Sequence, residues 1–121
     1  MLAVALLATG CTAIDYDRAP PPDFPKLEVV VIPTGFWETQ RICGGNLLFT
    51  VIACVQPNYE TKTCPIYTTT DDEIIMTHER DHCRGYDHYF TKCDPEDSMC
   101  GTWKKYKETR DESANNPRDS R

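Results

Sequence analysis

Residues 70–88 read TDDEIIMTHERDHCRGYDH, and this stretch decides both the fold and the chemistry that we expect. Thr70 and Glu73 have the spacing of a capping box, which satisfies backbone N–H groups at the start of a helix. Gly85 predicts the end of that helix, because glycine adopts the left-handed conformation without steric cost. The sequence therefore predicts a helix over residues 71–84.

Three histidines, two inside the predicted helix and one just after it, have a spacing that suits a metal ion. His78 and His82 are four residues apart, so both imidazoles lie on one helix face and can bind the same ion. Beyond the turn at Gly85, His88 is placed to return as a third ligand. Glu79 can reach a water at the ion, where a general base is needed. Three neutral ligands leave one position open, which is typical of catalytic rather than structural zinc.

The pattern His-Glu-x-x-His-x-x-Gly-x-x-His at residues 78–88 resembles the elongated zinc-binding motif of the metzincin metallopeptidases. The resemblance implies that three histidines bind Zn²⁺, namely His78, His82 and His88. It also implies that Glu79 is the general base in the hydrolysis of peptide bonds, with an activated water as nucleophile and a peptide or protein as substrate. Members of the family carry a methionine in a tight turn beneath the metal, and Met99 is the candidate here.

The expected fold class is α+β, with a small mixed sheet of about three strands packed on the one active-site helix. Strands are predicted at residues 27–32, 47–55 and 63–69, which are rich in β-branched side chains. Pro65 cannot donate a ladder hydrogen bond, so the last of these is expected at an edge. The metzincin resemblance gives that edge strand a role, which is to pair with extended substrate along residues 64–67.

Seven cysteines point to an oxidising compartment, and one of them, Cys11, stands apart from the rest. The other six predict a disulfide framework that stabilises a small core: Cys43, Cys54, Cys64, Cys83, Cys93 and Cys100. Six cysteines allow about 15 pairings, and the sequence does not choose among them.

The N-terminus is typical of an exported protein. Residues 1–10 resemble the end of a bacterial lipoprotein signal peptide, and Ala8-Thr9-Gly10-Cys11 resembles a lipobox with Cys11 as the lipidated residue. Residues 11–26 contain four prolines and predict an extended tether. We therefore expect a lipoprotein of the bacterial cell envelope, at the periplasmic face of the outer membrane. Its zinc domain would span residues 27–107, before a disordered charged tail at residues 108–121.

The net charge of −6 and a pI near 4.9 argue against a nucleic-acid partner, which usually requires a basic face. Two alternatives stay open at the site. Asp87 can replace His88 as third ligand, and Cys83 can be a ligand or a reactive thiol instead of a disulfide partner. A non-catalytic zinc-binding module and a structural envelope lipoprotein are the rival functions. The sequence indicates neither the natural substrate nor the oligomeric state.

Overall fold

The computed structural model describes residues 18–88 and 92–115. These residues form two compact units, one of residues 25–84 and one that combines residues 18–24 with the described part of the chain from Gly85 onwards. The expected signal peptide, Cys11 and the end of the expected tail, residues 116–121, lie outside the described residues. Within the described ranges, no helix is both long and apolar enough to cross a bilayer.

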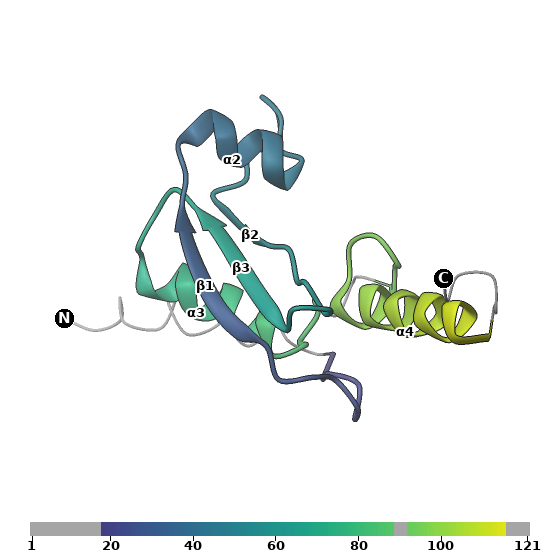
Figure 1. Ribbon diagram of the computed structural model, residues 1–121. Coiled ribbons are helices and arrows are strands. Elements are labelled where there is room, and N and C mark those ends of the chain that lie inside the picture. The colour runs from purple at the N-terminus through teal and green to yellow at the C-terminus, as the bar shows by residue number, and fades with distance from the viewer. Residues whose placement is uncertain (1–17, 89–91, 116–121) are drawn as a thin grey trace. The chain divides into compact units, whose positions relative to one another are not determined.

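A three-stranded mixed sheet forms the centre of the first unit (Figure 1). The strands are β1 (Glu28–Pro33), β2 (Ala53–Val55) and β3 (Thr63–Thr68), in the spatial order β1-β3-β2. β1 runs parallel to β3, with Val31 opposite Ile66, whereas β2 runs antiparallel to β3. The sheet and its helices confirm the predicted α+β class.

The prediction that residues 63–69 form an edge strand is wrong, because β3 is the central strand. Pro65 is accommodated where the pairing with β2 stops. The Gln56 N–H donates to the Pro65 carbonyl at 3.1 Å, and Pro65 has no N–H to return the bond, so the regular ladder ends at Val55 opposite Ile66. A central strand has both edges occupied, so the substrate pairing expected along residues 64–67 is not available there.

The segment between β1 and β3 differs most from the prediction. It contains a helix, α2 (Phe36–Cys43), which ends at Gly44 in the left-handed region with φ +74°. The predicted strand over residues 47–55 is wrong for all but its last three residues, which form β2. The side chains that α2 buries, Thr39 and Gln40, are polar. The buried face of this helix therefore could not be recognised in the sequence as a row of apolar residues.

The predicted active-site helix is present as α3 (Glu73–Cys83), and it lies along one face of the sheet (Figure 1). Its N-cap is Asp72 rather than Thr70, because the Asp72 carboxylate accepts hydrogen bonds from the backbone N–H groups of Ile74 and Ile75. The Thr70 hydroxyl instead accepts from the Asp72 N–H at 3.1 Å. α3 buries Met76, Glu79 and Cys83, a helical repeat that faces β2 and β3. Gly85 follows with φ +97°, which confirms the predicted stop.

Three disulfides connect these elements and confirm the expected framework. Cys43–Cys54 joins the end of α2 to β2, and Cys64–Cys83 joins β3 to the last residue of α3. Cys93–Cys100 lies in the second unit. Because Cys83 is a disulfide partner, it is neither a metal ligand nor a free thiol.

The second unit is organised by α4 (Met99–Asn115), so the predicted disorder is wrong for residues 108–115. The Trp103 ring stacks on Tyr106, with ring centroids 5.8 Å apart, and contacts Phe24 edge-on at 6.1 Å. These contacts stabilise the first turns of α4, and a helix that has begun extends easily. Residues 18–24, expected within the tether, therefore pack instead in this unit, where Arg18 also forms a backbone bridge with Asp87.

Candidate metal centre

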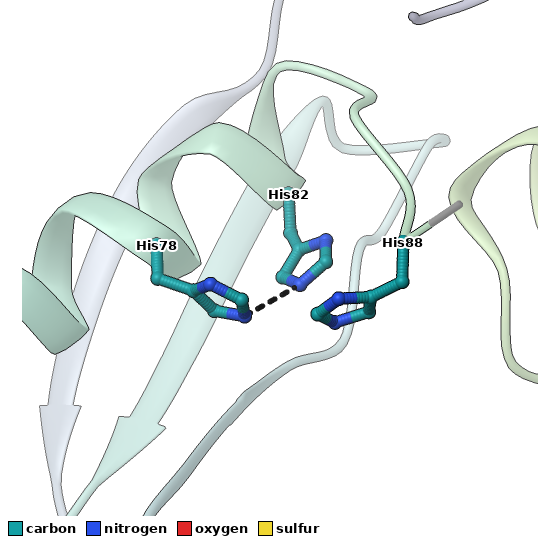
Figure 2. Close-up of side chains that lie close together, drawn as sticks. All are labelled: His78, His82 and His88. Atoms are coloured by element: carbon teal, nitrogen blue, oxygen red, sulfur yellow. Dashed lines mark hydrogen bonds between the residues drawn. The ribbon is translucent and has the colours of Figure 1, made fainter. Parts of the chain in front are cut away.

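The three histidines of the sequence motif converge in the structure (Figure 2). One ring nitrogen from each of His78, His82 and His88 lies within 4.8 Å of the other two, and all three side chains are half-buried. His78 and His82 come from successive turns of α3, and their Nε2 atoms are 3.1 Å apart. The structure thus brings together a group of three imidazoles that can bind a metal ion.

These distances suit a tetrahedral ion. Zinc–nitrogen bonds of about 2.0–2.1 Å at tetrahedral angles place two ligand nitrogens ~3.3 Å apart. The 3.1 Å between His78 and His82 is close to that spacing. His88 offers a ring nitrogen within 4.8 Å of both, so the three nitrogens can serve as ligands of one ion. Half-buried rings also leave solvent access for a fourth ligand.

Glu79 borders the histidine face of α3. At 3.6 residues per turn it lies about 60° around the helix from His82 and about 100° from His78. Its side chain is turned towards the sheet and is only 7% exposed. This burial raises the pKa of the Glu79 carboxyl to about 7, because desolvation penalises the charged form. A carboxyl that titrates near neutrality suits proton transfer.

A disulfide fixes the end of α3, which carries His82. The Cys64–Cys83 disulfide ties the residue after His82 to the central strand, so the end of α3 cannot separate from the sheet. Arg80 and Asp81, the residues between Glu79 and His82, form surface ion pairs with Glu73 and Arg84 at 2.9 and 3.1 Å. Charged residues inside the motif are therefore accommodated on the outer face of the helix, where such pairs contribute little to stability.

Gly85 allows the turn that leads from α3 towards His88. Its φ of +97° is unfavourable for any residue with a side chain. A Cβ here would also lie 2.6 Å from the Pro20 side chain and 2.8 Å from the Phe24 ring. Glycine is required at this position for both reasons.

Asp87 has a structural role that the sequence did not reveal. Its carboxylate is 3% exposed and accepts hydrogen bonds from the backbone N–H groups of Met99 at 2.7 Å and Cys100 at 3.0 Å. The Ser98 hydroxyl accepts from Gly101 N–H at 2.9 Å, so the first three N–H groups of α4 are all satisfied. Both carboxylate oxygens are engaged, so Asp87 is not free to replace His88, which remains the candidate for third ligand.

Met99 is buried, but it is the first residue of α4 rather than part of a tight turn. The predicted Met-turn is therefore wrong in its local geometry. The reason is the capping by Asp87, which makes a helix begin at this residue. The sequence gives no local signal for this cap, because the acceptor precedes its donors by twelve and thirteen residues.

No protein-family model, curated protein or solved structure matches this chain.

Proposed function

We propose that this protein is a zinc-dependent metalloendopeptidase. The observation that carries the proposal is the convergence of His78, His82 and His88 within 4.8 Å, beside a buried carboxyl, Glu79, whose pKa is raised to about 7. Three imidazole nitrogens with an open fourth position form the donor set of a catalytic zinc site. The metzincin resemblance of residues 78–88 supports the same reading.

Zinc held by the three histidines would act as a Lewis acid that activates water and polarises the scissile carbonyl. Glu79 takes a proton from the attacking water and passes it to the leaving amine. Its position three residues before His82 lets the carboxyl reach the metal side of the helix after a change of rotamer. The Cys64–Cys83 disulfide would hold α3, with Glu79 and His82, against the sheet during the reaction.

The substrate would be a peptide or protein in an extended conformation. Since β3 is central, the free edges of the sheet are those of β1 and β2. β2 is the edge strand that packs against α3, so we propose that the substrate backbone pairs with residues 53–55. Three disulfides support an oxidising compartment, and we extend the proposal to an exported lipoprotein of the cell envelope, anchored through Cys11.

The decisive experiment compares Glu79→Gln with Glu73→Gln. Both replace a carboxylate of α3 by an amide, but Glu73 is exposed and paired with Arg80 on the outer face. We expect both variants to bind zinc, Glu73→Gln to keep hydrolysing a peptide library, and Glu79→Gln to lose about 10²–10⁴ in kcat/KM. Undiminished cleavage by Glu79→Gln would refute the general base. A zinc-loaded wild type that cleaves nothing would favour the non-catalytic zinc module.

A further inference from the structure

The segment that follows α2 lacks charge to an unusual degree. Residues 42–59 contain no Asp, Glu, Lys, Arg or His, in a chain in which 26% of the residues are charged. The same segment holds Leu47, Leu48 and Phe49, so it combines large apolar side chains with the absence of charge. We refer to residues 46–52 as the apolar loop.

The tip of the apolar loop is exposed. Leu47, Leu48 and Phe49 are 82%, 87% and 75% exposed, and Ile52 is 46% exposed. Three consecutive large side chains with this much exposed surface form a projection rather than a groove. On the preceding helix Trp37 is also 69% exposed and contacts the Phe36 ring edge-on at 4.9 Å. Consecutive exposed apolar side chains of this size, as at residues 47–49, mark an interaction site.

The loop is held in a defined conformation. The Asn46 side-chain oxygen accepts from the N–H groups of Leu48 and Phe49 at 2.8 and 2.9 Å, and the Asn46 N–H donates to the Phe49 carbonyl. At its end, the Gln40 side chain donates to the Val51 carbonyl at 2.6 Å and accepts from the Val51 N–H at 2.8 Å. The Cys43–Cys54 disulfide closes the base. The apolar side chains are therefore presented to solvent by a preorganised turn.

The charge and shape of this loop favour one occupant. A protein partner would need a matching cavity for three adjacent side chains, and its interface commonly adds polar and charged groups at the rim. The hydrocarbon of a lipid bilayer can surround a projecting apolar loop of any shape. Burying a charge in hydrocarbon is costly, and residues 42–59 carry no charged side chain. An aromatic residue such as Trp37 prefers the boundary between hydrocarbon and water. With a net charge of −6, the chain gains nothing from anionic lipid, so the attraction must be apolar.

We propose that the apolar loop inserts into the acyl-chain region of a lipid bilayer. Leu47, Leu48 and Phe49 enter the hydrocarbon, and Trp37 and Asn46 lie near the headgroups. This contact is independent of the metal centre and of lipidation at Cys11. It gives the sheet unit its own point of attachment to a membrane surface.

The test measures binding of the full chain to phosphatidylcholine vesicles in a Cys11→Ser background, which removes the thiol that we propose to be lipidated. The apolar variant replaces Leu47, Leu48 and Phe49 by serine. Ile74→Ser is the matched control, because Ile74 is 64% exposed but lies on α3. We expect the triple variant to lower the partition coefficient by about 100-fold or more, Leu48→Ser by about tenfold, and Ile74→Ser by less than about twofold.

A second measurement reports insertion directly. In Phe49→Trp, the added tryptophan emission should shift to shorter wavelength on binding and be quenched by lipids brominated along their acyl chains. Binding that persists in the triple variant would overturn the proposal, as would unquenched emission from Trp at position 49. Loss of a dimer, rather than of vesicle binding, in the triple variant would also overturn it and assign the loop to a second copy of the chain.

Discussion

Replacement of Asp87 by alanine tests the assignment of this residue as the cap of α4. The substitution removes the acceptor for two backbone N–H groups, those of Met99 and Cys100, at 2.7 and 3.0 Å. Hydrogen bonds to a charged acceptor contribute about 1.5–3 kcal/mol each. Because Asp87 is 3% exposed, water cannot readily replace the carboxylate. We expect a loss of about 3 kcal/mol, which is a large part of the roughly 5–15 kcal/mol typical of small proteins.

The assay is urea denaturation of the oxidised protein at pH 7, followed by circular dichroism at 222 nm, with each variant compared at equal concentration. Asp87→Asn keeps one acceptor oxygen and should lose about half as much free energy of unfolding as Asp87→Ala, so it remains informative if the alanine variant does not fold. Asp97→Asn is the control, since Asp97 precedes α4 but is exposed. A change below about 0.5 kcal/mol in Asp87→Ala would refute the capping role.

Three further predictions concern the turn, the disulfide and the buried carboxyl near the candidate metal centre. Gly85→Ala should lower the free energy of unfolding by about 2 kcal/mol or more, because Gly85 has a positive φ and an added Cβ would meet close neighbours. Gly35→Ala should change it little, because an added Cβ there has no neighbouring atom within 4 Å. Equal effects of the two substitutions in thermal melts would contradict this prediction. Replacing Cys64 and Cys83 by alanine together should cost about 3 kcal/mol in denaturant titrations, and an unchanged midpoint would show that this bridge does not stabilise the fold. Glu79 binds its proton more tightly in the folded state, where its pKa is about 7 against an ordinary 4.5. As the pH rises from 4.5 to 7, the free energy of unfolding of the metal-free protein should therefore fall by up to about 3 kcal/mol. This loss should vanish in Glu79→Gln; parallel pH profiles of the two proteins would refute the raised pKa.

The features that the sequence predicted correctly depend on local patterns. The helix of the metal motif, its stop at Gly85 and the convergence of the histidines follow from spacings of three to four residues and from one glycine. The strand that became β1 was also visible, as a β-branched run. Even here the exact cap was missed, because Thr70 and Asp72 offer competing N-cap signals two residues apart.

The features that the sequence did not predict depend on distant parts of the chain. The order of strands is set by which edges meet after folding, so the central position of β3 could not be deduced from Pro65 alone. α2 was hidden because its buried residues, Thr39 and Gln40, are polar. α4 extends through a charged segment because its first turn is capped by Asp87 and anchored by Trp103. The pairing of the six cysteines could not be predicted either, because their positions in the sequence are compatible with many sets of disulfides.

The central claim is that three histidines hold one zinc ion. Elemental analysis of oxidised protein, dialysed after loading with zinc, tests it most directly. We expect one zinc per chain in the wild type and in Glu73→Gln, and a substantial loss in His88→Ala, which removes the third ligand. Wild-type protein that retains no zinc, or a His88→Ala variant that retains it as tightly as the wild type, would contradict the account.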